Sequence, residues 1–312
     1  MASLVVVGGC NMDLIAHAPR LPAAGETVLG DRFATAPGGK GSNQAVAAAR
    51  LGARVSFVGR VGTDDFGVRL RQMLDQESIE VRHLAVDQQA PSGVALITVD
   101  ERGENCIVVA SGANANLDEA DVDAAADTIR AARVLLLQLE SPIPALVRAS
   151  EIAARAGTRV VFSVGPARDV PEELLRRTSV LIANRREVCQ MAGMEARDLA
   201  DVETAARQLL ARGVGAVAAT LGAKGALAVD ASGARLVLGF PVKAIDTVGA
   251  GDAFSAGLSV ALANGEPLDV AVRVGNACGA LASTRPGAQP AMPGRAEVDR
   301  LLGMGHPDSG AD

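Results

Sequence analysis

Seven residues, DTVGAGD from Asp246 to Asp252, are the part of this chain best suited to chemistry. An apolar segment ends just before them, and the apolar pattern from Ala253 to Leu262 predicts a helix that ends near Asn264. The small residues Gly249–Gly251 therefore open a helix, where backbone N–H groups have no intrahelical partner and the dipole is positive. Such a turn can hold an anion.

The carboxylate of Asp252 belongs to the same predicted turn. An anion site beside a carboxylate is unfavourable for simple phosphate binding, because the two groups repel each other. The pair is useful if the carboxylate takes a proton from a hydroxyl group while the N–H groups stabilise a transferred phosphoryl group. A glycine-rich turn with an acidic residue that favours the helix dipole is the alternative interpretation.

Several polar segments elsewhere are suited to a polyhydroxylated ligand. The segment GGKGSNQA, Gly38 to Ala45, opens a predicted helix but lacks the spacing of a Walker phosphate loop. Asp13 and Glu140 each follow a predicted strand, and ligands of open α/β sheets bind at the carboxyl ends of strands. Together with Asn43 these groups favour a polyol site, although a hinge, a helix cap or a surface acid would explain each one singly.

Two further segments could serve a nucleotide. Asn184 and Glu187 follow a predicted strand, and an amide beside a carboxylate can hold hydrated Mg²⁺ through water. A helix cap followed by ordinary helical residues is the simpler interpretation of this pair. The turn TLGAKG, Thr220 to Gly225, allows backbone N–H groups to approach phosphate, and an ordinary hairpin explains it equally well.

The elements that position these residues alternate between short apolar strands and alanine-rich helices. Strands are predicted at 4–7, 55–58, 134–139, 159–163, 180–183, 216–220, 226–229 and 235–238, and helices at 43–51, 66–76, 120–131, 143–156 and 202–212. This alternation predicts an α/β fold with a doubly wound, mostly parallel sheet flanked by helices. The segments 26–35 and 92–109 alternate charge and threonine with apolar residues, which predicts a small antiparallel β lid.

Composition excludes several classes of function. A net charge of −6 and the absence of Trp and Tyr argue against nucleic-acid binding and base-stacking platforms. The four widely spaced cysteines indicate reduced thiols, and the three histidines have no zinc-ligand spacing. The sequence begins with a strand pattern, without a signal peptide or a membrane span, so we expect a cytoplasmic protein without membrane partners.

The chain resembles the ribokinase family (PfkB carbohydrate kinases) from its first strand to about Pro293. The resemblance rests on PGGKGSNQAVAAARLGA near the N-terminus, QLESP at 138–142, TLGAKG, DTVGAGDAF and TRPGAQP at 284–290. It implies transfer of the γ-phosphoryl group of ATP to a sugar, with the 5-hydroxyl of D-ribose as the expected acceptor. It also implies a ribokinase-like fold and, together with the exposed lid edges, a homodimer that pairs through the lid.

The resemblance assigns roles to residues of this sequence. Asp252 would be the general base, and Gly249, Ala250 and Gly251 the anion hole. The sugar ligands would be Asn11, Asp13, Gly39, Lys40, Gly41, Ser42, Asn43 and Glu140. The nucleotide site would comprise Asn184, Thr220, Leu221, Gly222, Ala223, Lys224, Gly225, Gly251 and Asn276. Asn184 and Glu187 would order Mg²⁺ through water, and an activating K⁺ would contact Asp246, Val248, Ala282, Arg285 and Gly287, near Ala291.

Three positions depart from the family pattern. SVGP at 163–166 replaces an Asn-Pro-x-Pro turn, Ala183 replaces the proline before Asn184, and Ala291 replaces a serine near the K⁺ site. A kinase of another sugar or of a nucleoside, such as deoxyribose, fructose or an adenosine-like substrate, therefore remains an alternative, as does a catalytically weak sugar-responsive binding protein. We expect an α/β kinase domain of residues 1–13, 40–91 and 113–302, a β lid of residues 14–39 and 92–112, and a flexible tail at 303–312.

Overall fold

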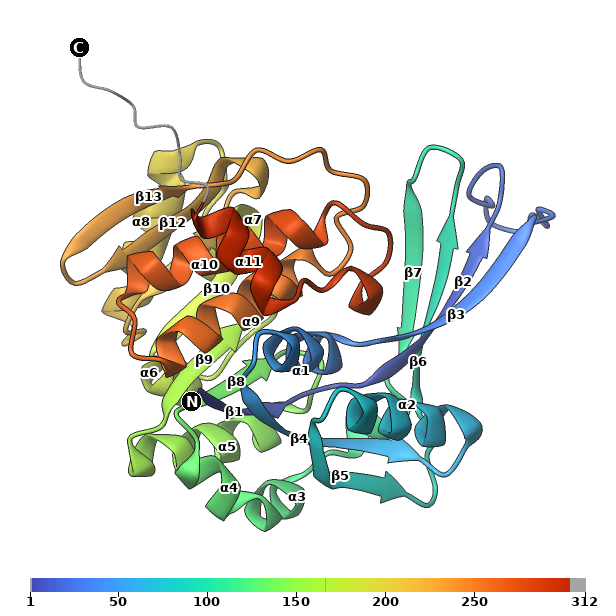
Figure 1. Cartoon of the computed structure of the whole chain (residues 1–312), viewed down its shortest axis with the longest axis horizontal. Coiled ribbons are helices and arrows are strands. Elements are labelled where there is room, and N and C mark those ends of the chain that lie inside the picture. Colours follow the sequence, from blue (N-terminus) through green and yellow to red (C-terminus); the bar gives the residue numbers. More distant parts are fainter. Residues whose placement is uncertain (1, 166, 304–312) are drawn as a thin grey trace.

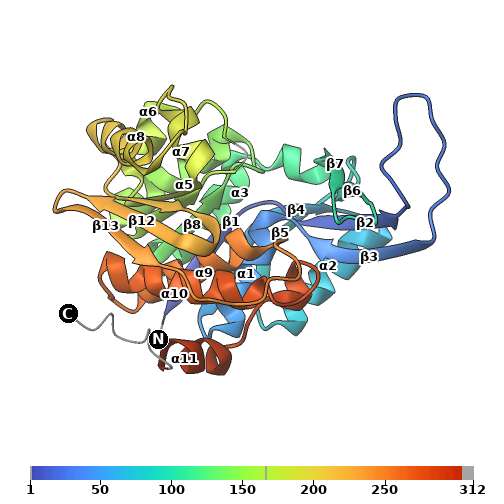
Figure 2. The same cartoon turned by 90° about the horizontal axis from the view of Figure 1, so that it is seen from above.

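The computed structural model describes residues 2–165 and 167–303, which form a large sheet between two layers of helices and a small sheet beside it (Figures 1 and 2). Residues 304–312 of the expected tail and Pro166 of the SVGP segment lie outside the described residues. Within the described residues, no helix has the length and apolar character needed to cross a membrane.

The large sheet has nine strands in the order β13-β12-β11-β10-β9-β8-β1-β4-β5. Their bounds are β1 Ser3–Val7, β4 Arg54–Gly62, β5 Glu80–Asp87, β8 Val134–Gln138, β9 Arg159–Ser163, β10 Val180–Asn184, β11 Val217–Thr220, β12 Gly225–Asp230 and β13 Gly233–Leu238. The neighbours from β5 to β11 are all parallel, whereas β12 and β13 form an antiparallel edge. The prediction of a doubly wound, mostly parallel sheet is confirmed.

Helices cover both faces of this sheet (Figure 2). They are α1 Lys40–Arg50, α2 Asp65–Gln76, α3 Glu119–Ala124, α4 Ala126–Ala131, α5 Ile143–Ala156, α6 Glu172–Arg177, α7 Arg185–Met191, α8 Leu199–Ala211, α9 Ala250–Ala263, α10 Leu268–Ala282 and α11 Arg295–Gly303, with short 3₁₀ segments η1 Gly112–Asn116, η2 Gly222–Lys224 and η3 Gln289–Ala291. Alternate residues of β1 enter two separate cores. Leu4 and Val6 pack on the side of α1, α9 and α10, and Val5 and Val7 on the side of α3 to α8. Burial on both faces explains the unbroken apolar strands of the sequence.

The small sheet consists of β2 Asn11–His17, β3 Arg32–Gly38, β6 Gly93–Val99 and β7 Asn105–Ala110, in the order β3-β2-β6-β7. It projects from one end of the large sheet, as the expected lid (Figure 1). The pairs β2–β3 and β6–β7 are antiparallel, and the central pair β2–β6 is parallel. The sheet is therefore two antiparallel pairs joined side by side.

Two local predictions were wrong, and two strands were not predicted. The strand predicted at 26–35 begins only at Arg32, because a loop of extended and turn conformation containing Gly25 and Gly30 precedes it. The helix predicted at 120–131 divides at Ala125 into α3 and α4. Two strands were not predicted, β2 and β5, since their mixed polar and apolar residues lack the continuous apolar pattern of a buried strand.

Candidate active site

The first turn of α9 is shaped by Gly249. This residue caps the helix in the left-handed conformation, with φ 76°, and a Cβ atom there would lie 3.0 Å from the Ala288 Cα atom. A side chain is therefore excluded on two grounds. A Cβ atom added at Gly251 would have no neighbour within 4 Å, so the helix opens onto free space at this point. The predicted anion-binding turn has the geometry that the sequence indicated.

Asp252 is buried one residue further along α9, and both of its carboxylate oxygens accept hydrogen bonds from α1. Asn43 Nδ2 donates to Oδ2 at 3.0 Å, and Gln44 Nε2 donates to Oδ1 at 2.9 Å. Gln44 in turn accepts a bond of 2.7 Å from Gln138 Nε2. The glycine-rich segment and the DTVGAGD segment, about 200 residues apart in sequence, thus meet at one carboxylate.

Electrostatics around Asp252 favour a proton acceptor. Burial raises the pKa of Asp252, while the charge of Lys40 and the two amide donors oppose that rise. The pKa of Lys40 is itself raised, chiefly by Asp252, with further contributions from Glu140 and Glu187. The Lys40 ammonium group therefore interacts electrostatically with three carboxylates. Its positive charge stabilises the ionised form of Asp252, which is the form that a base requires.

The residues predicted to hold a sugar gather where the chain passes from β1 of the large sheet into β2 of the lid. The backbone N–H of Lys40 donates to Glu140 Oε2 at 2.8 Å. Gly39 has a φ of 92°, and a Cβ atom there would lie 2.9 Å from the Asn11 nitrogen. A Cβ atom on Gly38 would overlap the Asp13 carboxylate. The glycines therefore allow the backbone to pack closely against Asn11 and Asp13.

Asp13 and Glu140 are hydrogen-bond acceptors, and the described residues around them supply too few hydrogen-bond donors for both carboxylates. Burial, together with the charges of Glu140 and Asp252, raises the pKa of Asp13 to about 7. The pKa of Glu140 is also raised by burial, which the charge and the backbone N–H of Lys40 partly offset. A ligand that presents several hydroxyl donors would stabilise both ionised carboxylates.

Asn43 adds an unsatisfied acceptor to this cluster. Its Oδ1 atom is buried and accepts no hydrogen bond in the described part of the chain, while its Nδ2 atom is held by Asp252. A buried carbonyl oxygen without a donor is costly, which indicates that a ligand or water supplies the donor. The position of this oxygen beside the candidate base suits a hydroxyl group that is about to lose its proton.

Two of the predicted sugar ligands have other contacts. The Ser42 hydroxyl is fully buried, donates to the carbonyls of Gly38 and Gly39, and accepts a bond of 3.2 Å from Gln289 Nε2. A Cβ atom on Gly41 would lie 2.7 Å from the Gly9 carbonyl oxygen. These two residues shape the loop from within: Gly41 packs against the Gly9 backbone, and the Ser42 hydroxyl is occupied by protein partners.

Sequence reasoning missed Asn114, which comes from η1 beyond the lid. Its Nδ2 atom donates to Asn11 Oδ1 at 2.8 Å and to the Cys10 carbonyl at 3.1 Å, and its Oδ1 atom accepts from the Cys10 N–H at 3.0 Å. Asn114 therefore fixes both the backbone and the side-chain amide next to the candidate sugar site. Nothing in the local sequence signals this role, because the contact joins residues 103 apart.

A cavity of about 500 Å³ lies on the other side of the α9 N-terminus. Of the residues predicted to bind the nucleotide, six line it: Thr220, Gly222, Ala223, Gly225, Gly251 and Asn276. Phe240, Val242 and Phe254 provide apolar walls. Asn276 Nδ2 donates to the Val237 carbonyl at 3.0 Å, so this amide also anchors β13. The size and lining of the cavity suit a purine.

The remaining predicted nucleotide residues lie at a neighbouring cleft. Leu221 and Lys224 line this cleft of about 710 Å³ with Asn184, and Thr220 and Gly222 line both spaces. Asn184 and Glu187 form a capping box at the start of α7, in which each side chain accepts from the other's backbone N–H at 2.9 Å. The second carboxylate oxygen of Glu187 is not used by the capping box and lies beside Gly165, so it can still contact a hydrated Mg²⁺.

Of the predicted K⁺ ligands, Val248 and Gly287 contact Asp246. This carboxylate accepts from the Val248 N–H at 2.9 Å and from the Gly287 N–H at 2.8 Å, which joins the two loops. Within the described residues, the carbonyls of Val248, Arg285 and Gly287 accept no hydrogen bond, and that of Ala282 accepts a long one of 3.4 Å. Free carbonyl oxygens near a carboxylate suit a monovalent cation. Ala291 is buried in η3 nearby and offers only a methyl group.

The family model described as pfkB family carbohydrate kinase matches residues 1–295. This match extends over nearly the whole chain and includes both sides of the site described above. The chain belongs to the pfkB family of carbohydrate kinases. Both DTVGAGD and the glycine-rich segment lie within the matched range, so the family assignment and the geometry concern the same residues.

Similar proteins within this family are sugar kinases. The chain is 38% identical over 300 residues to a ribokinase of Haemophilus influenzae, covering 96% of this chain and 98% of the relative. It is 33% identical over 252 residues to a deoxyribokinase of Salmonella typhi, covering 80% and 82%. The solved structure of Arabidopsis thaliana ribokinase with ribose and ATP has a TM-score of 0.89 and 31% identity, covering 97% and 99%. The ribokinase-like fold is confirmed.

Proposed function

We propose that this carbohydrate kinase phosphorylates D-ribose at its 5-hydroxyl, with ATP as the phosphoryl donor. The observation that carries the proposal is the position of Asp252. It is buried between the Asn11–Asp13–Glu140 cluster and the cavity of about 500 Å³, next to the open first turn of α9. A base between a polyol site and a nucleotide site suits transfer of a phosphoryl group from one to the other.

In the proposed reaction, Asp252 accepts the proton of the 5-hydroxyl, and the oxygen forms a bond to the γ-phosphorus of ATP. The bond from that phosphorus to the β–γ bridging oxygen breaks, and ADP leaves with the electron pair. The backbone N–H groups of Gly249–Gly251 stabilise the charge on the transferred phosphoryl group. The Lys40 ammonium group interacts with Asp252 and Glu140, and its positive charge would help to neutralise the charge of the transferred phosphoryl group.

The sugar would be oriented by carboxylates and amides. Asp13 and Glu140 accept from its hydroxyl groups, and the Asn11 and Asn43 amides complete the set. Gly39 and Gly41 allow the loop to pack closely on the backbone of Gly8–Asn11, and Ser42 holds the loop in shape. Ribose carries several hydroxyl groups in a small volume, which matches a site with many acceptors and few apolar walls.

The nucleotide would place its base in the cavity beside Phe240 and Asn276, with its phosphates directed along Thr220 toward Gly251. Mg²⁺, when bound with ATP, supplies charge neutralisation on the phosphates. Asn184 and Glu187 would contact it through water. The carbonyls of Val248, Ala282, Arg285 and Gly287 and the Asp246 carboxylate would hold an activating K⁺.

We further propose a homodimer that pairs through the lid. Asp13, Ala95 and Val109 are cross-strand neighbours, so the face of the lid that carries Asp13 also carries Val109. Val109 and Ile107, two residues apart on this face, are each 50% exposed. A second lid would cover them. Light scattering should then give twice the chain mass for the parent and a monomer for Ile107→Asp; a monomeric parent would contradict pairing.

We also propose a cytoplasmic location, because the proposed reaction uses ATP.

Deoxyribose is a second candidate substrate, because one similar protein is a deoxyribokinase. Ribose and deoxyribose differ by the 2-hydroxyl group. Asp13 or Glu140 would bind this hydroxyl group if its carboxylate faces it.

The decisive experiment is an ADP-release assay with ribose, deoxyribose, fructose and nucleosides. We expect the highest kcat/KM for ribose, and Asp252→Asn should lower kcat by roughly 10²–10⁴. Preference for another acceptor, or a variant within about threefold of the parent, would overturn the proposal.

A further inference from the structure

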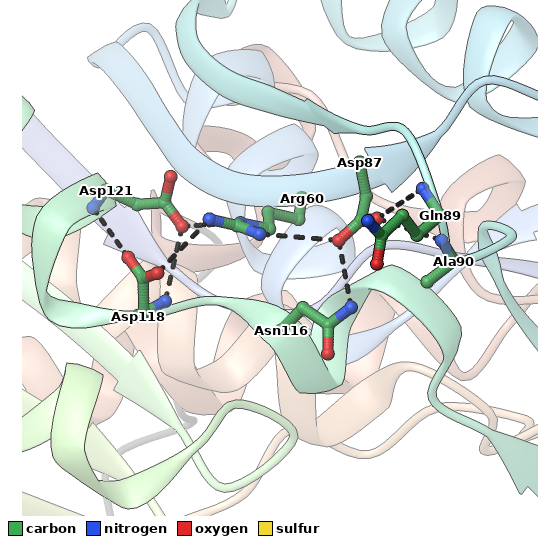
Figure 3. Close-up of polar contacts among 7 residues, drawn as sticks. All are labelled: Arg60, Asp87, Gln89, Ala90, Asn116, Asp118 and Asp121. Atoms are coloured by element: carbon green, nitrogen blue, oxygen red, sulfur yellow. Dashed lines mark hydrogen bonds and ion pairs between the residues drawn. The ribbon is translucent and has the colours of Figure 1, made fainter.

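Arg60, near the end of β4, contacts three carboxylates outside the site described above (Figure 3). Its Nε atom lies 2.6 Å from Asp121 Oδ2, and its two terminal nitrogens lie 3.3 Å from Asp87 Oδ2 and from Asp118 Oδ2. The side chain is only 22% exposed. A single guanidinium group thus neutralises three acids that would otherwise repel one another.

These acids lie on the two connections that join the β6–β7 pair of the lid to the rest of the protein. Asp87 ends β5, directly before the segment 88–92 that leads into the lid, and it accepts from the N–H groups of Gln89 and Ala90 at 2.9 Å each. Asp118 and Asp121 form the capping box of α3, directly after the segment that leaves the lid. Arg60 therefore ties the incoming chain to the outgoing chain at the base of the lid.

The outgoing segment includes η1, which is held from the same network. Asn116 of η1 donates to Asp87 Oδ2 at 2.9 Å, on the atom that also contacts Arg60 (Figure 3). Two residues earlier, Asn114 donates to Asn11 Oδ1 and bonds twice to the Cys10 backbone. A short chain of contacts thus runs from Arg60 through Asp87 and η1 to the Asn11 amide.

The direction of the Asn114 bond matters for ligand binding. Because the Asn11 oxygen accepts from Asn114, the Asn11 NH₂ group is left as the donor for a ligand. A displacement of η1 would free this amide to rotate and would also release the turn at Cys10. A Cβ atom on Gly93 would overlap both Asn11 Oδ1 and Asn114 Nδ2, so this corner is tightly packed and transmits small shifts.

We propose that Arg60 is a positioning residue for sugar binding, which fixes η1 through Asp87 and Asn116 so that Asn114 orients the Asn11 amide. The inference rests on the proposed role of Asn11 as a sugar ligand. Removal of the Arg60 charge leaves three facing carboxylates without a cation between them, and their repulsion separates the two connections of the β6–β7 pair. The nucleotide cavity lies at the opposite end of the large sheet and is unaffected.

A merely stabilising ion pair is the competing explanation, and Arg148 provides the matched control. Arg148 also joins two carboxylates, Asp123 at 2.7 Å and Glu151 at 2.9 Å, and its side chain is 32% exposed. Its partners lie on α3 and α5, and neither belongs to a connection of the lid. Arg148→Gln therefore removes an ion-pair cluster of similar size without touching η1.

Steady-state kinetics test the proposal. In Arg60→Gln we expect the KM for ribose to rise roughly five- to tenfold, which corresponds to the loss of one oriented hydrogen bond, while kcat and the KM for ATP stay within about twofold. Arg60→Lys keeps one charge and should give an intermediate KM. Arg148→Gln should leave all three constants near the parent values. An Arg60→Gln protein with the ribose KM of Arg148→Gln would overturn the inference.

Hydrogen exchange measured by mass spectrometry separates this inference from the proposed function. In the ligand-free protein, amides of residues 110–117 should exchange faster in Arg60→Gln than in Arg148→Gln, whatever the substrate is. If the parent does not turn over ribose but this acceleration is observed, the proposed function fails and the positioning of η1 by Arg60 holds. Equal exchange at 110–117 in the two variants would overturn the role of Arg60 even in an active ribose kinase.

Discussion

Gln44 Nε2 lies 2.9 Å from Asp252 Oδ1, and the orientation of this amide is fixed from its other end. The Gln44 oxygen accepts from Gln138 Nε2 at 2.7 Å, so its NH₂ group is the part that must face Asp252. Gln138 ends β8, Gln44 belongs to α1, and Asp252 belongs to α9. Three elements of the core therefore set the direction in which the candidate base points.

Replacement of Gln44 by leucine should shift the pH dependence of catalysis. The Gln44 donor lowers the pKa of Asp252 against the effect of burial. Without it, the pKa rises further, so Asp252 becomes protonated at a higher pH as the solution is acidified, and the acidic limb of the kcat profile moves to higher pH. Profiles from pH 5.5 to 9 would measure this. The exposed Gln208→Leu variant is the control, and an unchanged acidic limb in Gln44→Leu would contradict the role.

Asp13 should make both stability and ribose affinity depend on pH. Its pKa in the folded chain is about 7, whereas an aspartate in an unfolded chain titrates near ~4. The folded state therefore binds the proton more tightly, and the contribution of Asp13 to stability falls as pH rises from about 4 to about 7. Asp13→Asn should gain roughly 1–3 kcal/mol in free energy of unfolding relative to the parent between pH 4 and pH 8, measured by urea unfolding.

The same titration affects the substrate. Ribose hydroxyls donate more strongly to an ionised carboxylate, so the KM for ribose in the parent should fall as pH rises from 6 to 8. Asp13→Ala should raise this KM at least ~tenfold with little change in nucleotide affinity. Loss of ATP binding in Asp13→Ala would place the residue at the other site.

The sequence predicted the parts of the site that depend on local backbone. DTVGAGD predicted small residues at the start of a helix, and Gly249 caps α9 there in a left-handed conformation that glycine adopts without strain. The sequence could not predict the partners of Asp252 and Asn11. Gln44 and Asn114 reach them from segments 208 and 103 residues away, and only the topology brings these together.

The lid illustrates the same limit. Its strands are partly exposed and mix polar with apolar residues, so their pattern does not separate strand from loop, and β3 begins six residues later than expected. The large sheet was predicted better, since burial on both faces makes β8 and β9 continuous apolar segments.

Glu187 allows its charge and its capping role to be tested separately. Its carboxylate accepts from the Asn184 N–H within the capping box. Glu187→Gln keeps a side-chain acceptor but removes the charge, so the Mg²⁺ concentration for half-maximal activity should rise several-fold with an unchanged melting temperature. Glu187→Ala should also lose roughly 0.5–1 kcal/mol of stability through the cap. An unchanged Mg²⁺ requirement in both variants would make Glu187 a helix cap alone.

Asp246 carries the prediction about monovalent cations. Its oxygens already accept from Val248 and Gly287, so it joins the loop before α9 to the loop that follows α10. Carbonyls of these two loops accept no hydrogen bond within the described residues, and a weakly hydrated cation bound by them would neutralise the Asp246 charge near the proposed anion-binding turn. We therefore expect K⁺ to raise kcat over Na⁺ at equal ionic strength, with a modest ratio because Ala291 contributes no oxygen. Asp246→Ala should abolish the difference in kcat between K⁺ and Na⁺.

The conservative Asp246→Asn variant separates the structural role of Asp246, which is to join the two loops, from the role of its charge. It retains an acceptor for one loop, so it should keep the fold stable but still lose most of the K⁺ response. Equal rates in K⁺, Na⁺ and a bulky organic cation for the parent would leave Asp246 with the bracing role alone.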